Sequence, residues 1–140
     1  MKVAIGCDHG GIDLKNTVAA VLIELGHVVD DQGCNSTDSV DYPDFARSVS
    51  SLVKDGECEC GILICGTGIG MSMAANRIPG IRAALCNEMF SAKMSREHND
   101  ANILCLGARV IGPGLAAEIV RTWMTSEFAG GRHQRRIDMF

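Results

Sequence analysis

Short apolar runs alternate with segments of helical periodicity along almost the whole chain, and this alternation restricts the fold more than any other feature of the sequence. The apolar runs do not alternate strictly with polar residues, which is typical of parallel strands covered on both faces. We therefore expect a three-layer α/β/α sandwich around a five-stranded parallel sheet, formed by a single domain over residues 1–140. The expected strands cover residues 2–7, 27–31, 62–65, 81–86 and 102–106, and the expected helices cover 12–25, 43–55, 70–77, 88–98 and 113–128.

The charge and aromatic content of the chain exclude one large class of function. The 140 residues carry a net charge of -4, and only 4% of them are aromatic, whereas nucleic-acid binding needs a basic face and stacking rings. No apolar stretch approaches the roughly 18 residues of a membrane span, and the first residues lack the layout of a signal peptide. We expect a cytoplasmic protein that binds neither nucleic acid nor a membrane.

The cysteines do not form the pattern of a disulfide framework. There are seven of them, several lie in apolar runs, and no Cys-x-x-Cys pair occurs, so most are expected to be reduced thiols in the core. Cys58-Glu59-Cys60 has no matching second pair of ligands. We therefore expect neither a metal site nor any other cofactor.

A glycine-rich turn, Cys65-Gly66-Thr67-Gly68-Ile69-Gly70, follows an apolar run and places a thiol where a strand gives way to a helix. Three glycines let the backbone approach a ligand closely, and the free N–H groups there favour an anion and a thiolate. A dinucleotide site would need a glycine at position 71, and a cysteine phosphatase would need an arginine there, but residue 71 is Met71. A P-loop would need a lysine in this turn, which contains none. Two readings remain open, a thiol beside an anion-binding turn and a tight turn whose Cys65 only packs in the core.

Polar residues gather at the expected ends of three strands. Asp8-His9 follows the first strand, Cys65-Gly66-Thr67-Gly68 follows the third, and His98-Asn99-Asp100 and Arg109 flank the fifth. Ligands of parallel sheets bind at the carboxyl ends of the strands, so we expect these residues to converge at one edge. Each of them alone has a purely structural explanation, as a helix cap or a solvated charge, and only their coincidence indicates a site.

Five motifs occur in an order that is specific to one family. They are Gly6-Cys7-Asp8-His9-Gly10-Gly11, Asp41-Tyr42-Pro43, residues 64–70, Ser95-Arg96-Glu97-His98-Asn99-Asp100 and Gly130-Gly131-Arg132-His133-Gln134-Arg135-Arg136. On these residues the chain resembles the sugar-phosphate isomerases, the family that includes ribose 5-phosphate isomerase B and the galactose 6-phosphate isomerase subunits. The resemblance covers nearly the whole chain and implies the same sandwich, of Rossmann-like type.

The resemblance implies an aldose–ketose isomerisation through a cis-enediol(ate), with ribose 5-phosphate and ribulose 5-phosphate as substrate and product in the pentose phosphate pathway. The alternatives are a hexose 6-phosphate, namely galactose 6-phosphate or allose 6-phosphate, and, from another class, a non-catalytic phosphosugar-binding domain. A thiol redox protein would need a resolving cysteine near Cys65, and none lies within Cys-x-x-Cys reach.

The resemblance also assigns roles to residues. It implies that Cys65 is the catalytic base and that His98 and Thr67 open the sugar ring. It implies a homodimer, with a tetramer as the alternative, whose active sites are shared between subunits, the His98-Asn99 segment and some arginines reaching across. The implied substrate-binding residues are Asp8, His9, Tyr42, Gly66, Gly68, Ile69, Gly70, Asn99, Arg109, Arg132 and Arg136.

Overall fold

A single parallel sheet forms the centre of the molecule, and the computed structural model describes all residues, 1–140. The strand order is β2-β1-β3-β5-β4, and every neighbouring pair is parallel. The expected three-layer sandwich with a five-stranded parallel sheet is therefore confirmed. The strands are β1 (Lys2–Cys7), β2 (Val28–Asp31), β3 (Cys60–Cys65), β4 (Ala83–Leu85) and β5 (Ile103–Gly107).

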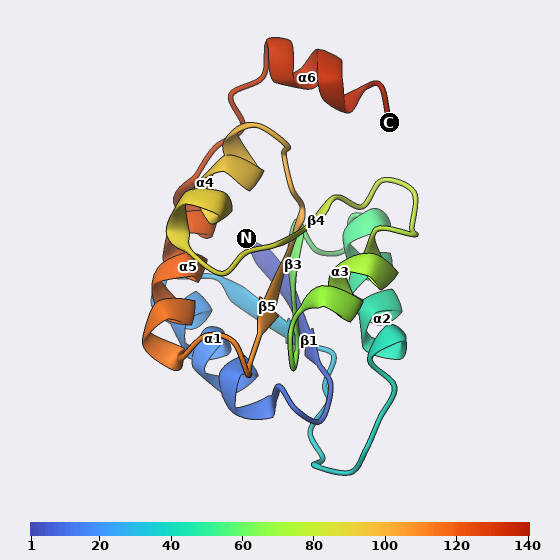
Figure 1. Ribbon diagram of the computed structural model, residues 1–140, viewed down its shortest axis with the longest axis vertical. Coiled ribbons are helices and arrows are strands. Elements are labelled where there is room, and N and C mark those ends of the chain that lie inside the picture. Colours follow the sequence, from blue (N-terminus) through green and yellow to red (C-terminus); the bar gives the residue numbers. More distant parts are fainter.

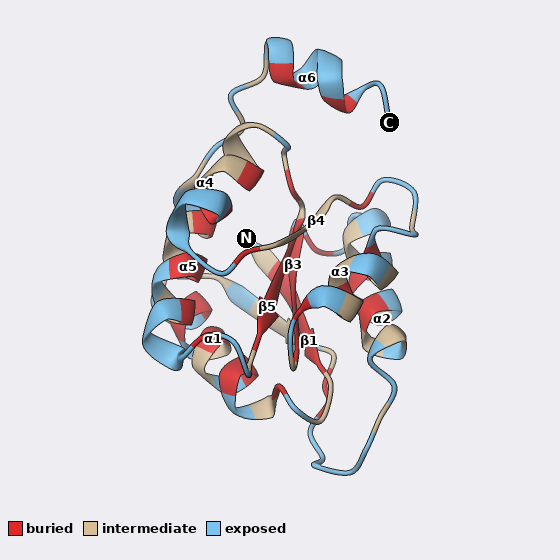
Figure 2. Ribbon diagram, in the orientation of Figure 1, coloured by how far each residue is buried: buried red, intermediate tan, exposed pale blue.

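Helices cover both faces of this sheet (Figure 1). One face packs against α1 (Ile12–Glu24), α4 (Met89–Glu97) and α5 (Pro113–Thr125), and the other packs against α2 (Tyr42–Lys54) and α3 (Ile69–Ala75). Figure 2 shows the buried residues concentrated in the strands and on the inner sides of these helices. No helix is both long and apolar enough to span a lipid bilayer.

Glycines in the central strands bring α2 close to the sheet. A Cβ on Gly61 would lie 2.6 Å from the Val49 side chain, and one on Gly6 would lie 2.9 Å from the same side chain. Val49 therefore packs directly on the backbone of β1 and β3, which no larger residue at either position would allow. This packing holds α2 against β1 and β3.

The edge strand β4 is shorter than the apolar run 81–86 predicts. The side chain of Asn76 donates to the Ala83 carbonyl and accepts from the Ala83 N–H, both at 2.8 Å, and the Arg82 N–H donates to the Asn102 side chain at 2.8 Å. Side-chain amides thus take backbone groups that a longer ladder would use. They also satisfy part of the free edge of the sheet, which would otherwise attract another strand.

A sixth helix, α6 (Arg132–Ile137), was not expected from the sequence. It begins after Gly130 and Gly131, which have φ values of +64° and +56°, and its buried residues are His133 and Ile137. Those two residues are four positions apart and share one face, which is the only apolar signal in a segment otherwise rich in arginine. In Figure 1, α6 projects beyond the end of the sandwich at the top of the view.

Candidate active site

The strand order reverses between β1 and β3, and the first group of expected site residues lies at the carboxyl ends of these strands. β1 leads outward to β2, whereas β3 starts the other half of the sheet. Cys7 pairs with Ile64, and Cys65 pairs with Gly107 of β5. The turns after β1, β3 and β5 are therefore adjacent, as a ligand site at a topological switch point requires. We call the group in these turns the thiol cluster; it comprises Asp8, His9, Tyr42, residues 65–70 and Arg109.

Cys65 is the last residue of β3, and its side chain is almost completely buried, with 5% of the residue exposed. The N–H of Gly68 donates to its Sγ at 3.1 Å. Gly68 can aim this N–H backward because it has a left-handed φ of +77°, a conformation that a glycine adopts at no steric cost. The sulfur thus accepts a hydrogen bond from the turn that follows it.

The turn also contains N–H groups that have no protein acceptor. Those of Gly66, Thr67 and Gly70 donate to no backbone or side-chain atom, whereas the N–H of Ile69 donates to the Thr67 Oγ1 at 3.3 Å. Backbone donors are almost always paired in folded proteins, so unpaired donors beside a buried thiol indicate a place for an oxygen-rich ligand. The Thr67 hydroxyl, which accepts from Ile69, keeps its own proton free to donate.

Arg109 reaches across two of the turns from the loop after β5. A Cβ on Gly66 would lie 3.4 to 3.6 Å from the Arg109 side chain, and one on Gly10 would lie 3.8 Å from its Nη2. Arg109 forms no ion pair with any acidic residue, and its own N–H donates to the Gly66 carbonyl at 2.9 Å. A guanidinium that is free and anchored over two backbone turns is well suited to an anion.

Asp8 and His9 are held in place by the backbone around them. The Oδ1 of Asp8 accepts the N–H of Gly10 at 2.9 Å, and Nδ1 of His9 accepts the N–H of Val40 at 3.2 Å. Because Nδ1 accepts this bond, the ring proton of neutral His9 lies on Nε2, which can donate to a ligand. On the other side of the cluster, Tyr42 at the start of α2 lies against Gly70.

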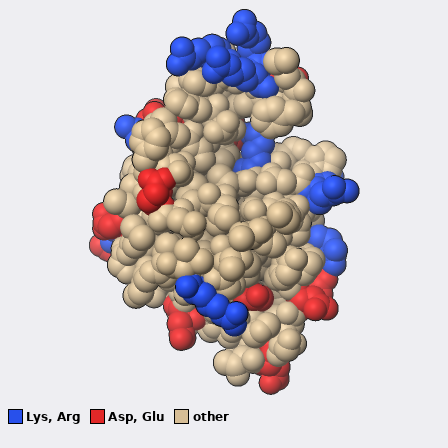
Figure 3. Space-filling model, in the orientation of Figure 1, with Lys and Arg blue, Asp and Glu red and all other residues tan.

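A second group of expected site residues lies elsewhere. His98 is the C-terminal cap of α4, and its ring stacks on that of His133 in α6 with 4.1 Å between the ring centroids. Asn99 follows directly, and Arg132 and Arg136 belong to α6. We call these residues the α6 cluster. Figure 3 shows Lys and Arg side chains gathered over the top of the view, where Figure 1 places α6.

The electrostatics of the α6 cluster are those of a cationic surface whose arginines have no acidic partner. Burial, together with the neighbouring His98, Arg132 and Arg136, lowers the pKa of His133 below its usual value. None of the arginines in α6 forms an ion pair with an acidic residue. Arginines without acidic partners are of the kind that can bind a negatively charged group.

The thiol cluster and the α6 cluster do not meet within one chain. Residues 98–102 precede β5 and lie at its amino end, whereas Arg109 follows it. The six steps of extended chain from residue 102 to residue 108, at about 3.3 Å each, separate the two ends by roughly 20 Å. The expectation that His98, Asn99 and Asp100 share an edge with Cys65 is thus wrong, because residues that precede a parallel strand lie at the opposite end of the sheet from those that follow it.

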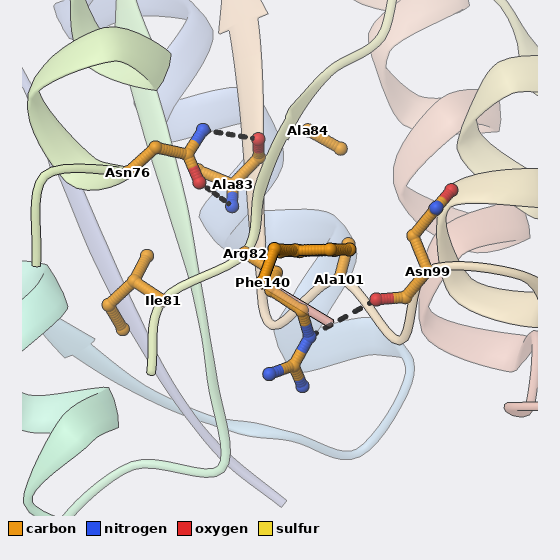
Figure 4. Close-up of a pocket in the computed structure, with 8 residues that line it drawn as sticks. All are labelled: Asn76, Ile81, Arg82, Ala83, Ala84, Asn99, Ala101 and Phe140. Atoms are coloured by element: carbon orange, nitrogen blue, oxygen red, sulfur yellow. Dashed lines mark hydrogen bonds between the residues drawn. The ribbon is translucent and has the colours of Figure 1, made fainter. Parts of the chain in front are cut away.

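The largest cavity, ≈ 490 Å³, adjoins the α6 cluster and not the thiol cluster (Figure 4). Sequence reasoning did not single out Arg82, which organises it: its Nε donates to the carbonyls of Asn99 and Asp100 at 3.1 and 2.9 Å, and its Nη2 lies 3.0 Å from the Asp100 carboxylate. The only signal in the sequence was an arginine at the start of an apolar run. The lining residues are Asn76, Ile81, Arg82, Ala83, Ala84, Asn99, Ala101 and Phe140.

Comparison with known proteins identifies the family. The family model described as Ribose/Galactose Isomerase matches residues 3–140. The chain belongs to this family. It is accordingly an isomerase, and the alternative of a non-catalytic binding domain is set aside.

Relatives within the family are similar over nearly their whole lengths. Ribose-5-phosphate isomerase B of Escherichia coli is 50% identical over 137 residues, which are 98% of this chain and 92% of the relative. D-erythrulose-4-phosphate isomerase of Pectobacterium atrosepticum is 45% identical over 139 residues, which are 99% of this chain and 91% of the relative. The structure of Clostridium thermocellum ribose-5-phosphate isomerase B has a TM-score of 0.98 and 56% identity, covering 99% of this chain and 94% of that one.

Proposed function

We propose that this isomerase interconverts ribose 5-phosphate and ribulose 5-phosphate in the cytoplasm, within the pentose phosphate pathway, without a cofactor. The observation that carries the proposal is the buried Cys65 thiol at the switch point, with the Gly68 N–H on its sulfur and unpaired N–H groups beside it. A base next to donors for an oxyanion is what an enediolate reaction needs. The similarity to ribose-5-phosphate isomerase B of Escherichia coli supports the five-carbon substrate.

Cys65, as the thiolate, removes the proton from C2 of the open-chain aldose. The electron pair of the broken C–H bond forms the C1–C2 double bond, and the carbonyl oxygen becomes an enediolate. The N–H groups of Gly66 and Gly70 stabilise this oxygen, and one such donor can contribute about 3 kcal/mol to a transition state. A proton then passes from O2 to O1 of the enediolate, and protonation of C1 by the Cys65 thiol gives the ketose, with its carbonyl at C2, and regenerates the thiolate. Gly68, which the resemblance implies to be a substrate-binding residue, donates its N–H to the sulfur in this structure.

The other residues bind the substrate and open its ring. His9 and Arg109 bind the phosphate, whose geometry fits a guanidinium. Asp8 accepts a bond from a sugar hydroxyl, while Tyr42 and Ile69 contact the sugar. The α6 cluster completes the site from a second subunit of a homodimer: its His98, with Thr67 of the first subunit, moves the proton that opens the ring, Asn99 holds a hydroxyl, and Arg132 and Arg136 contribute to the phosphate site.

Exposed apolar residues support this homodimer. Ile69 and Met73 of α3 and Met89 and Phe90 of α4 are all exposed, and Phe90 is 71% exposed. They lie on either side of β4, the edge strand of the sheet. Apolar residues gathered around one sheet edge favour association. Because the thiol cluster and the α6 cluster lie at opposite ends of the sheet, two antiparallel chains in a twofold dimer can supply both clusters to each site.

Isomerisation in deuterated buffer tests the chemistry. We expect the wild type to convert ribose 5-phosphate to ribulose 5-phosphate, with solvent deuterium entering at C1 of the ketose. Proton NMR monitors both the conversion and the deuterium incorporation. Cys65→Ala should lose both turnover and exchange while still binding the substrate. Cys60→Ala, at the buried amino end of the same strand, is the matched control and should keep both. Turnover by Cys65→Ala would refute the assigned base.

A panel of sugar phosphates tests the substrate. Galactose 6-phosphate, allose 6-phosphate and D-erythrulose 4-phosphate, the last taken from the name of the Pectobacterium relative, run beside ribose 5-phosphate. The highest kcat/KM for ribose 5-phosphate supports the proposal. A higher value for another sugar would reassign the substrate and leave the mechanism in place.

Mixing two inactive variants tests the shared site. Cys65→Ala and His98→Ala each damage every site of their own homodimers. When they are mixed and allowed to exchange subunits, half of the dimers are mixed, and each mixed dimer holds one site with both residues intact. We expect recovery of about a quarter of the wild-type activity from this statistic. No recovery, in a mixture shown to exchange subunits, would contradict the shared site.

A further inference from the structure

The side chain of Tyr42 occupies space that any residue other than glycine at position 70 would need. A Cβ on Gly70 would lie 2.5, 2.7 and 2.9 Å from Cζ, Cε2 and Oη of the Tyr42 ring. Such distances are far below van der Waals contact, so either the ring or the turn would have to move. Gly70 is an ordinary helical residue, without the left-handed φ of Gly68. The glycine is thus required for space and not for backbone conformation.

The ring is held against this turn by the elements that carry it. Tyr42 is the first residue of α2, Asp41 is the N-terminal cap in extended conformation, and Pro43 restricts the backbone that follows. The packing of Val49 on β1 and β3 fixes the same helix on the sheet. Displacing the ring therefore requires a change of its side-chain torsions, because the backbone cannot retreat.

One side of the ring remains accessible beside the thiol cluster. Tyr42 is 39% exposed, and so it is not simply a core residue. Its neighbour Gly70 has an N–H without an acceptor and follows Ile69, which is 47% exposed. A flat, rigid wall therefore stands over the turn that begins with Cys65.

We infer that Gly70 and Tyr42 together limit the space over the turn that begins with Cys65 and thereby select sugar phosphates by chain length. The missing side chain at residue 70 lets the Tyr42 ring close over the turn, which leaves room for a short sugar and excludes a longer one. This inference rests on the proposed function. Relatives named for a five-carbon and a four-carbon sugar phosphate are both close to this chain, so length is a property that such a site must control.

A double-mutant cycle tests the pair. We expect Tyr42→Ala to raise kcat/KM for allose 6-phosphate relative to ribose 5-phosphate by about tenfold or more. This is the discrimination that a closely packed site achieves between substrates that differ by one carbon unit. Gly70→Ala should shift this ratio in the same direction, because it displaces the ring. In the Tyr42→Ala background, Gly70→Ala should add no more than about twofold, since the ring it would displace is gone.

Gly66→Ala is the matched control, because it is the same substitution in the same turn. The three atoms nearest to its Cβ would all belong to Arg109, at 3.4 to 3.6 Å, and not to Tyr42. Its effect on the ratio should be the same with and without Tyr42. Tyr42→Phe keeps the ring and should keep the wild-type ratio. Additive effects of Gly70→Ala and Tyr42→Ala, or a Tyr42→Phe ratio like that of Tyr42→Ala, would overturn the inference.

The thermal stability of the same variants separates this inference from the proposed function. Gly70→Ala should lower Tm in the wild type and leave it nearly unchanged in the Tyr42→Ala background, whichever sugar the enzyme uses. If the wild type turns over none of the sugars, the proposed function fails while this packing cycle can still hold. If the Tm changes are additive, the pair is not coupled, and the inference fails even in an active enzyme. Should Gly70→Ala alone not fold, recovery of folding in the double variant would itself show the coupling.

Discussion

At the scale of single residues, two glycines hold the thiol cluster together by leaving space for backbone. A Cβ on Gly107 of β5 would lie 2.7 Å from the Thr67 carbonyl oxygen, and one on Gly68 would lie 2.5 Å from the Leu85 side chain and 3.0 Å from the Leu106 carbonyl carbon. The glycine turn is thus pressed against the end of β5. The position of the Thr67 hydroxyl and of the donors around Cys65 depends on this contact.

Gly107→Ala should therefore damage both stability and activity. The backbone of Thr67 is a rigid neighbour, so we expect a loss of about 1–3 kcal/mol in the free energy of unfolding, with a lower kcat. The control is Gly114→Ala near the start of α5, where a Cβ meets nothing within 4 Å; it should stabilise the protein by about 0.5 kcal/mol. Urea unfolding measures both. A Gly107→Ala protein as stable as the control would contradict the close contact.

His98→Ala should impair substrates according to whether they form rings. Ribose 5-phosphate closes through O4, whereas a four-carbon sugar with phosphate on O4 has no hydroxyl left to close a five-membered ring. General acid–base catalysis of ring opening contributes about 10²-fold or more, so we expect a loss of that order for ribose 5-phosphate and a much smaller one for D-erythrulose 4-phosphate. Initial rates with both sugars provide the measurement. Equal losses would contradict the ring-opening role.

At the scale of elements, an ion pair between the buried Lys15 and the partly exposed Asp31 ties α1 to the end of β2. The Nζ of Lys15, which is fully buried, donates to both oxygens of Asp31 at 2.8 and 2.7 Å and to the Asn35 side chain at 2.7 Å. The segment after β2 continues along β1, where the Cys7 N–H donates to the Gly33 carbonyl at 2.6 Å. The pair thus stabilises the chain next to Asp8.

Replacing Asp31 should lower the free energy of unfolding more than replacing Lys15. Asp31→Asn leaves a buried ammonium without its counter-ion, and we expect a loss of about 3 kcal/mol in the free energy of unfolding. Lys15→Met leaves a carboxylate whose side chain is 41% exposed and can be hydrated, so the loss should be less than half as large. Urea unfolding at pH 7 compares the two. The reverse order would mean that the pair does not control this junction.

The elements also show which parts of the structure the sequence could predict. The strands and the α1 to α5 helices follow from hydrophobic periodicity, and the position of Cys65 beside Asp8 and Arg109 follows from parallel topology. The helix α6 did not follow from hydrophobic periodicity, because only His133 and Ile137 form its buried face and the rest of the segment is rich in arginine. His98 lies at the edge opposite to the expected one because it precedes β5, although it is close to that strand in sequence. The partner of the Gly68 N–H depends on a left-handed φ, which the sequence permits but does not specify.

At the scale of the whole molecule, four buried thiols make the fold sensitive to alkali. Burial raises the pKa of Cys7 and Cys86 to about 11 and that of Cys60 to about 12, and it raises the pKa of Cys105 further still. In the unfolded chain these thiols titrate near 9.0. The folded state therefore retains protons that the unfolded state loses, and the stability present below pH 9 is lost as pH rises toward 11.

We expect the free energy of unfolding to fall above pH 9 by roughly 1.4 kcal/mol per pH unit for each such thiol. Cys105→Ala removes one of these thiols, so it should reduce the dependence of the unfolding free energy on pH by the contribution of one thiol. This holds whatever the substitution does to stability at pH 7. The measurement is urea unfolding between pH 7 and pH 10.5. The quantity compared between the two proteins is the slope of the unfolding free energy against pH, and not the urea midpoint at any one pH. An unchanged slope in Cys105→Ala would contradict the effect of burial on that thiol.

The distance between the thiol cluster and the α6 cluster has a consequence for how the enzyme is supplied. If Cys65 is the base and His98 of a second chain opens the ring, as proposed, a newly made chain turns over no sugar until it meets another chain. At low copy number the output then rises with the square of the chain concentration. We expect specific activity to fall on dilution below the dimer dissociation constant, so that doubling the expression of a scarce enzyme yields about four times the flux.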